Sequence, residues 1–180
     1  MADERGDADV ELAIRAVTGD EVAFVEIVRR YDSGLRRLTY RLLGDRDAMD
    51  DVLQEAYLNA FGSIPRFRGQ ASPRTWLYRI VYNACLDHLR SLRRQPVGQY
   101  VDSATRDPSE QADLRLSLAD ALATLAPEER TAVLLVDAEG LSYNEAAAVT
   151  GVAAGTIASR LSRARAALRR ALREQEGASK

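Results

Sequence analysis

The segment from Leu141 to Leu172 constrains the fold of this 180-residue chain more than any other. It starts with the run Ser142–Glu145, in which a serine precedes a glutamate by three residues, as in a helix-capping box. Gly151 ends this short helix, and a longer helix begins near Ala154. Two helices joined by a tight turn predict a helix-turn-helix, which fits the major groove of DNA.

The second of these helices has two chemically different faces. Apolar residues recur at helical spacing and predict one buried stripe, formed by Ile157, Leu161, Ala164, Leu168 and Leu172. The opposite side holds serines and arginines, namely Ser159, Ser162, Arg163, Arg169, Arg170 and Arg173, flanked by Arg160 and Arg165. Those in the N-terminal half can reach base edges, and those further along can follow only the DNA backbone. A solvated basic face or a coiled-coil segment is the alternative, but the capped helix and the glycine turn favour DNA binding.

Composition excludes several classes of protein. Hydrophobic residues make up 46% of the chain, which is enough for a core, yet no long uncharged apolar run predicts a membrane span. The first residues are acidic and lack the apolar centre of a signal peptide. A single cysteine, Cys85, excludes an internal disulfide and a multi-cysteine metal site. We therefore expect a cytoplasmic protein.

The net charge of −2 conceals an uneven distribution along the chain. Residues 61–95 carry 7 basic and 1 acidic side chains, and residues 156–180 carry 7 and 2. In contrast, residues 1–60 carry 8 basic and 14 acidic side chains, and residues 96–155 carry 3 basic and 10 acidic ones. Two basic blocks on predicted helices indicate two surfaces that meet phosphate, although an ordinary mosaic of surface charge is the alternative.

Periodicity predicts an all-α chain made of two small helical domains. Helices are expected over residues 9–18, 20–44, 47–61, 72–93, 111–125, 127–140, 142–151 and 154–174. Asp20 and Ser72 are the expected N-caps of the second and fourth helices. Residues 95–110 hold two prolines and little periodicity, which predicts a flexible linker between a domain at 1–94 and a domain at 111–180.

The first basic block lies on the fourth predicted helix and on the loop before it. The outer face of this helix is expected to present Arg79, Tyr82, Asn83, Arg90, Arg93 and Arg94. Trp76 follows a loop that holds Phe67, Arg68 and Gln70. Arginine neutralises phosphate and an aromatic face stacks on an unpaired base, so this pattern is typical of a surface for single-stranded nucleic acid. Packing of Trp76 in the core is the alternative.

The third predicted helix is acidic on its outer side. The residues expected on that side are Asp51, Gln54, Glu55 and Leu58. An exposed leucine framed by acids is typical of a protein-docking patch, and it would repel DNA. A solvated acidic face with one isolated leucine is the alternative.

No catalytic constellation is found in the sequence. The chain has one histidine and one cysteine, and it lacks both a phosphate-binding GxxxxGK[ST] loop and an HExxH metal motif. We therefore expect no enzymatic activity, no catalytic residue, no metal, no cofactor and no small-molecule substrate.

Three stretches of the chain resemble the extracytoplasmic-function (ECF) sigma factors of bacterial RNA polymerase. DAMDDVLQEAYLNAF (residues 47–61) is similar to the segment that binds core polymerase. FRGQASPRTWLYRIVYNACLDHLR (67–90) is similar to the segment that reads and melts the −10 element. LSYNEAAAVTGVAAGTIASRLSRARAALR (141–169) is similar to the helix-turn-helix that reads the −35 element.

The resemblance implies a role for each surface. Residues 1–94 would be sigma domain 2 and residues 111–180 sigma domain 4. The polymerase-binding residues would be Asp51, Gln54, Glu55 and Leu58. The −10 binding and melting residues would be Phe67, Arg68, Gln70, Ser72, Trp76, Arg79, Asn83 and Arg90. The −35 element would be read by Thr156, Ser159, Arg160 and Arg163.

The resemblance also implies the partners. Core RNA polymerase would be bound through its largest-subunit clamp and its β-subunit flap. Promoter DNA would be bound both as duplex and as single strand, and an anti-sigma factor would hold the protein inactive. An autonomous helix-turn-helix regulator is the alternative, but such a protein needs neither a second basic block with aromatic residues nor an acidic docking helix.

Overall fold

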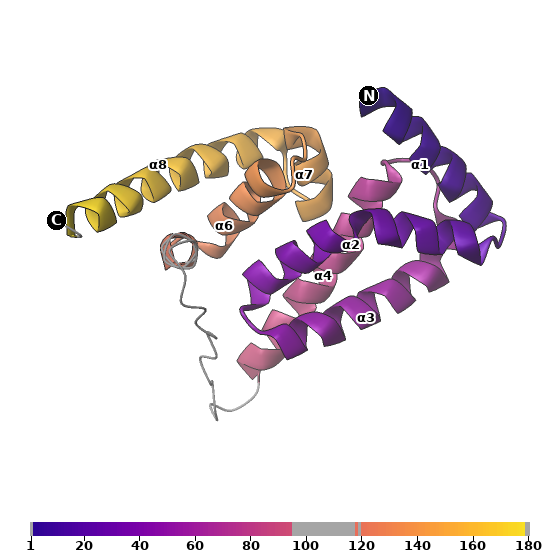
Figure 1. The fold of residues 1–180 in the computed structure, drawn as a ribbon, viewed down its shortest axis with the longest axis horizontal. Coiled ribbons are helices and arrows are strands. Elements are labelled where there is room, and N and C mark those ends of the chain that lie inside the picture. The colour runs from indigo at the N-terminus through magenta and orange to yellow at the C-terminus, as the bar shows by residue number, and fades with distance from the viewer. Residues whose placement is uncertain (1, 95–117, 119, 179–180) are drawn as a thin grey trace. The chain divides into compact units, whose positions relative to one another are not determined.

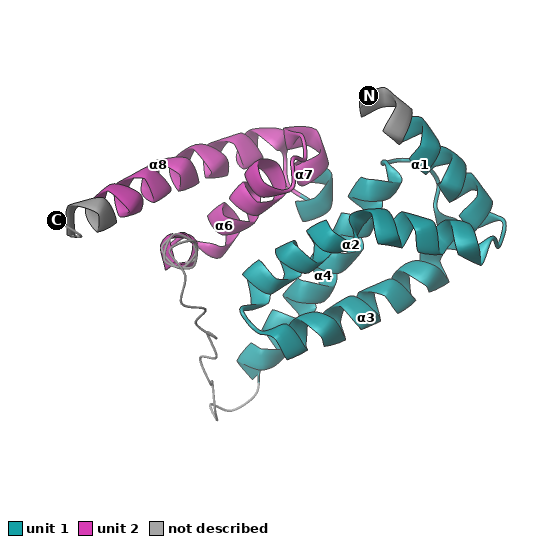
Figure 2. Cartoon of the chain, in the orientation of Figure 1, with its two compact units in different colours: residues 1–99, 148–151 teal, residues 100–147, 152–180 magenta. Residues whose placement is uncertain are grey.

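The computed structural model describes residues 2–94, 118 and 120–178 and divides the chain into two compact units. Unit 1 comprises residues 1–99 with 148–151, and unit 2 comprises residues 100–147 with 152–180 (Figure 2). Throughout the described residues the regular structure is helical and contains no strand, which confirms the all-α prediction. The predicted linker at residues 95–110 lies outside the described residues.

Over its described residues 2–94, unit 1 is built from four α-helices and one 3₁₀ turn (Figure 1). They are α1 (Ala2–Val17), α2 (Glu21–Leu43), α3 (Arg46–Ser63), η1 (Ile64–Arg66) and α4 (Pro73–Arg94). Asp20 caps α2 as predicted, because its carboxylate accepts a hydrogen bond from the Ala23 amide at 3.0 Å. Gly44 ends α2 in the left-handed conformation, at φ 75°, and its amide donates to the Tyr40 carbonyl.

The core of unit 1 lies between α2, α3 and α4, which pack against one another, while α1 lies along α2. Its fully buried side chains include Ile27, Leu35, Leu38, Leu53, Leu77 and Val81. Burial of one such aliphatic side chain stabilises a fold by about 1.5–3 kcal/mol. The packing fixes the outer faces of α3 and α4 relative to each other, and these faces carry the predicted sites.

A buried carboxylate joins α1 to α2. Asp9 is 5% exposed, and it accepts hydrogen bonds from the Tyr31 hydroxyl and, at 2.8 Å, from Arg30 Nη1. Burial, followed by the hydrogen bond to Asp9, raises the pKa of Tyr31 above its ordinary value. Sequence periodicity could not reveal this network, because its partners lie 21 and 22 positions from Asp9.

Cys85 is expected to be chemically inert in the folded protein. Burial raises the pKa of its thiol to about 11, and its Sγ lies 3.8 Å from Thr39 Oγ1. At pH 8 the thiolate population is therefore about 200-fold smaller than that of a free cysteine with a pKa near 8.5. We expect a disulfide reagent to label Cys85 at least about 200-fold more slowly at pH 8 in the native protein than in urea. Equal rates would show that Cys85 is not buried in solution.

The described part of unit 2 contains a short helical segment at residues 120–123, followed by α6 (Pro127–Val133), η2 (Leu134–Ala138), most of α7 (Tyr143–Thr150) and α8 (Ala154–Ala178). The last residues of α7, 148–150, group with unit 1. The segment η2 is one turn of π-helix, a rare conformation that often accompanies functional sites. Helix α6 packs along α8, and Leu134, Leu135, Ile157 and Leu161 are fully buried.

Several helix boundaries differ from the predicted ones. Helix α1 begins at Ala2 rather than at Asp9, and the helix predicted over 127–140 changes to π geometry at Leu134. Most of the helix predicted over 111–125 lies outside the described residues. Among the helices that the structure describes, none combines the length and apolar character that a bilayer crossing requires.

Candidate nucleic-acid interface

The four residues predicted to dock a protein are all exposed on α3, where Leu58 is 65% exposed. Gln54 and Leu58 line a groove of about 740 Å³ between α2 and α3, together with the exposed side chains of Val25 and Phe61. Asp51 and Glu55 are one helical turn apart on the same helix. We call these six residues the docking patch. Sequence reasoning missed Phe61 and Val25, although Phe61 follows Leu58 at helical spacing.

An ion-pair network fixes one edge of this groove. Arg36 on α2 donates to Asp32 at 3.1 Å and to Asp50 at 2.7 Å, so it ties α2 to α3. Tyr57 donates from its hydroxyl to the other oxygen of Asp32 at 2.8 Å. These bonds leave the acids at Asp51 and Glu55 available for a partner, because neither makes an ion pair within the described part of the chain. An apolar groove beside unpaired acids suits a basic, partly apolar protein surface.

Most of the residues predicted to bind the −10 element lie together. Phe67, Arg68, Gln70, Trp76 and Arg79 gather at the loop before α4 and on the first turns of α4, where they line one pocket. The rings of Phe67 and Trp76 meet edge to face, with centroids 5.4 Å apart. Trp76 is half-buried, so it both packs against Phe67 and retains an accessible surface. The structure thus shows that Trp76 packs against Phe67, and base contact by its accessible surface stays a prediction.

Local caps set the position of this pocket. Ser72 Oγ accepts from the Thr75 amide at 3.1 Å and donates to Thr75 Oγ1 at 2.9 Å, so Ser72 begins α4 as predicted. Its hydroxyl is therefore engaged in the cap. Gly69 adopts φ 68°, which reverses the loop between η1 and α4.

The remaining predicted residues follow one face of α4. Asn83 and Arg79 are both exposed and one turn apart. Arg90 lies about 21 Å along the helix from Trp76 and pairs with Asp87 at 2.9 Å, so it is separate from the pocket. The prediction that Tyr82 is exposed was wrong, because the residue is 8% exposed. Helix α4 packs against α1, α2 and α3, and three neighbours bury a wider face than a single stripe.

The helix-turn-helix is formed by α7 and α8. Ser142 and Glu145 make the predicted capping box, in which the Ser142 amide donates to Glu145 Oε2 at 2.8 Å and the Glu145 amide donates to Ser142 Oγ at 3.2 Å. Gly151 turns the chain at φ 74°, and α8 begins three residues later. Thr156, Ser159 and Arg160 therefore occupy the first two turns of α8, where side chains of a recognition helix reach base edges.

Two arginines of α8 are held by acids of α6 and η2. Arg163 donates from Nε to Glu129 at 2.8 Å, and Arg165 forms two bonds with Asp137 at 3.0 and 2.5 Å. The bonds to Asp137 raise the pKa of Arg165 above its ordinary value. A guanidinium has five donors, so the bond through Nε holds the Arg163 side chain against Glu129 and leaves its Nη donors unused among the described residues. Sequence reasoning missed this contact, because Glu129 and Arg163 are 34 positions apart.

Within the described ranges, no group of three or more histidine, cysteine, aspartate or glutamate side chains is arranged to hold a metal ion.

Two protein-family models match this chain, one in each unit. The model of sigma-70 region 2 matches residues 27–95, and the model of sigma-70 region 4 matches residues 115–168. The first match contains the docking patch residues of α3 and the pocket of Phe67 and Trp76, and the second contains the helix-turn-helix. The domain boundaries at 94 and 111 remain predictions.

Individual relatives agree with these models. The chain is 40% identical to the ECF RNA polymerase sigma factor SigM of Mycobacterium tuberculosis, over 92% of this chain and 85% of the relative. Among solved structures it is similar to CnrH in complex with the cytosolic domain of CnrY, with 28% identity, a TM-score of 0.75 and coverage of 93% of this chain and 98% of the other. It is also similar to the sigma factor RpoE of Bartonella quintana in complex with the anti-sigma factor NepR, with 27% identity, a TM-score of 0.69 and coverage of 83% and 96%. The chain belongs to the ECF RNA polymerase sigma factors of the sigma-70 family.

Proposed function

We propose that this sigma factor divides promoter recognition among the three surfaces described above. The docking patch binds the largest-subunit clamp of core RNA polymerase. The pocket of Phe67, Arg68, Gln70, Trp76 and Arg79 binds the −10 element and stabilises its melted form. The first turns of α8 read the −35 element, and unit 2 contacts the β-subunit flap.

The observation that carries this proposal is the pocket of unit 1, which joins aromatic rings and cations in one place. A protein that binds duplex DNA only through its helix-turn-helix has no use for such a pocket. Opening a base step costs a few kcal/mol, and stacking of each base on an aromatic ring returns about 1–3 kcal/mol. Melting can therefore proceed without a hydrolysed cofactor.

Replacement of Trp76 by alanine is expected to slow promoter opening by about 5- to 150-fold, the equivalent of one lost stacking contact. Holoenzyme binding to closed duplex should change little, because the −35 surface is untouched. Fluorescence of 2-aminopurine placed in the −10 element measures the opening rate. Trp76→Phe is the matched control, since it keeps an aromatic face, and it should retain most of the rate.

Replacement of Arg163 by alanine is expected to weaken binding to the −35 duplex by about 1–3 kcal/mol while leaving the opening rate unchanged. Arg163 is 62% exposed, so loss of its pair with Glu129 should affect stability little. Glu129→Gln tests the orienting role of Glu129, and we expect a smaller loss of −35 affinity. If the Arg163 and Trp76 variants each lost −35 affinity and opening rate to the same extent, the assignment of these two steps to separate surfaces would be contradicted.

We also propose that the protein acts in the cytoplasm and that an anti-sigma factor regulates it. Core polymerase and promoter DNA are both cytoplasmic in bacteria, so we place the protein in the cytoplasm. The similarity to a sigma factor solved with its anti-sigma factor supports an anti-sigma factor as a further partner. Such a protein would compete with polymerase by covering the docking patch or the DNA-binding surfaces.

Dependence on polymerase distinguishes this function from that of an autonomous regulator. Footprinting of promoter DNA with the protein alone and with the protein plus core polymerase provides the test. We expect protection of the −35 and −10 elements only when core polymerase is present. Full protection by the protein alone, unchanged by polymerase, would favour the regulator.

A further inference from the structure

Helix α8 is held on two flanks by acids of the segment that α6 and η2 form. Glu129 accepts from Arg163 Nε at 2.8 Å, and Asp137 accepts from Arg165 at 3.0 and 2.5 Å. Successive residues of a helix lie about 100° apart around its axis, so Arg163 and Arg165 are about 160° apart. They therefore lie on opposite sides of the buried apolar stripe of α8. We call these four residues the flanking pairs.

Arg165 connects three elements of unit 2 at one point. Its partner Asp137 belongs to the π turn η2, where the Glu139 amide donates to the Leu134 carbonyl at 3.0 Å. Arg165 also hydrogen-bonds the side chain of Tyr143, which lies in the first turn of α7. The helical angle places Arg165 about 120–180° from the four residues proposed to read the −35 element. It thus holds α8 from the side opposite to the reading residues.

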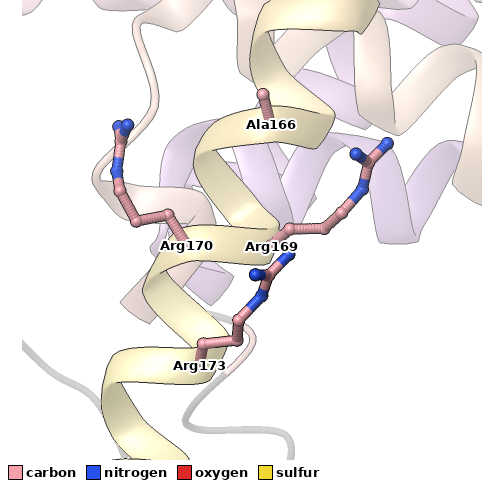
Figure 3. Close-up of a pocket in the computed structure, with 4 residues that line it drawn as sticks. All are labelled: Ala166, Arg169, Arg170 and Arg173. Carbon is pink, nitrogen blue, oxygen red and sulfur yellow. The ribbon is translucent and has the colours of Figure 1, made fainter.

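The arginines further along α8 are placed differently. Arg169, Arg170 and Arg173 extend outward around Ala166, and all three are exposed (Figure 3). Arg165, in contrast, is half-buried beside Asp137. The two arginines of the flanking pairs lie within three consecutive residues of α8, directly after the turns that carry the reading residues. The flanking pairs therefore act on the part of the helix whose orientation matters for base recognition.

Rotation of α8 about its own axis decides which side chains reach base edges. A helix with its side chains has a radius of about 5–6 Å, so a rotation of about 20° moves a side-chain tip by about 2 Å. Hydrogen bonds tolerate only about 0.5 Å in the distance between donor and acceptor. Apolar packing is not directional, whereas the two bonds of an arginine with a carboxylate have a fixed geometry. The flanking pairs can therefore fix a rotation that the apolar stripe alone does not.

We propose that Asp137, acting through Arg165, is a positioning residue for recognition of the −35 element. It fixes the rotation of α8 that presents Thr156, Ser159 and Arg160 to base edges, while Glu129 holds the opposite flank. This inference rests on the proposed reading of the −35 element by the start of α8. Asp137 and Arg165 contribute to the discrimination between sequences without contacting a base.

The test compares holoenzymes containing the wild-type protein, D137N, R165Q and the double variant D137N/R165Q. Each is titrated with a promoter duplex mapped by run-off transcription and with a duplex that carries a scrambled −35 sequence. The readout is the ratio of the two affinities. We expect this ratio to fall about 5-fold in each single variant, the upper end for one exposed ion pair, and no further in the double variant. Partial unfolding lowers both affinities by the same factor, so the ratio reports positioning rather than stability.

The matched control is Glu128→Gln, which neutralises an exposed acid of α6, and its ratio should equal that of the wild type. The charge swap D137R/R165D restores the ion pair and should bring the ratio back to within about 2-fold of the wild type. An unchanged ratio in D137N overturns the positioning role. Equal loss of affinity for both duplexes overturns it as an effect on stability. Additive losses in the double variant overturn it because Arg165 would then act independently of Asp137.

A second measurement follows the rotation of α8 in the free protein. Nitroxide labels are attached at Ala126→Cys before α6 and at Ser162→Cys on α8, both at exposed positions, while the buried Cys85 stays unlabelled. Electron paramagnetic resonance then gives the distribution of distances between the labels. We expect a narrow distribution in the wild-type background and a broader one with D137N. An unchanged distribution would overturn the hold of Asp137 on α8.

The two proposals fail in different ways in these experiments. If wild-type holoenzyme does not prefer the promoter to the scrambled −35 duplex, the proposed reading function is wrong, and the distance distribution still decides whether Asp137 holds α8. If that preference is present and D137N changes neither the ratio nor the distribution, only the positioning role is wrong.

Discussion

Reversal of charge at Asp51 and Glu55 to arginine will abolish binding to core RNA polymerase. Both carboxylates are exposed on α3 beside the apolar groove that holds Leu58 and Phe61. Disruption of a buried charge pair at an interface costs about 2–5 kcal/mol, and reversal adds repulsion, so affinity should fall by at least about 100-fold. Fluorescence anisotropy of labelled protein titrated with core polymerase measures this change.

The fold should survive this double reversal, because neither carboxylate makes an ion pair among the described residues. Helix α1 offers a matched control in the same unit. D7R/E11R reverses two exposed acids that are also four residues apart, and its polymerase affinity should equal that of the wild type. Unchanged affinity in the Asp51 and Glu55 variant would remove the docking patch from the proposed function.

Replacement of Asp9 by alanine will destabilise unit 1 by about 2–3 kcal/mol. The carboxylate is 5% exposed and accepts from Tyr31 and Arg30, so its loss leaves a half-buried hydroxyl and a guanidinium without their partner. This loss of stability should be smaller than the roughly 3–5 kcal/mol that breaking a fully buried ion pair costs, because the Arg30 side chain is 36% exposed.

Urea unfolding followed by tryptophan fluorescence measures this loss in unit 1 specifically, since Trp76 is the single tryptophan of the chain. Asp7→Ala is the control on the same helix, because Asp7 is exposed, and its free energy of unfolding should stay within about 0.5 kcal/mol of the wild type. Equal stability of the two variants would show that the contact between α1 and α2 does not depend on Asp9.

Features set by neighbours in sequence were predictable. The N-cap at Asp20, the start of α4 at Ser72 and the capping box of Ser142 and Glu145 each involve residues within three positions, so the residue types alone specify them. The same holds for the exposed acids of α3, whose helical spacing places them opposite the buried side. The family resemblance then supplied the proposed role of each surface, which helical spacing could not.

Contacts between distant helices were not predictable. Glu129 and Arg163 are 34 positions apart and Asp137 and Arg165 are 28 apart, so their pairing depends on how α6 and η2 pack against α8. These pairs change the interpretation of the basic helix, because two of its arginines are already paired with acids of α6 and η2. Burial of Tyr82 was missed for a related reason, since several helices surround α4.

The most direct test of the central claim is run-off transcription with purified core polymerase on a panel of promoters. We expect discrete start sites when both core polymerase and this protein are present, and none of these sites with core polymerase alone. The Asp51 and Glu55 reversal should remove every one of them. Absence of any new start site across the panel with the wild-type protein would contradict its action as a promoter-specific initiation factor.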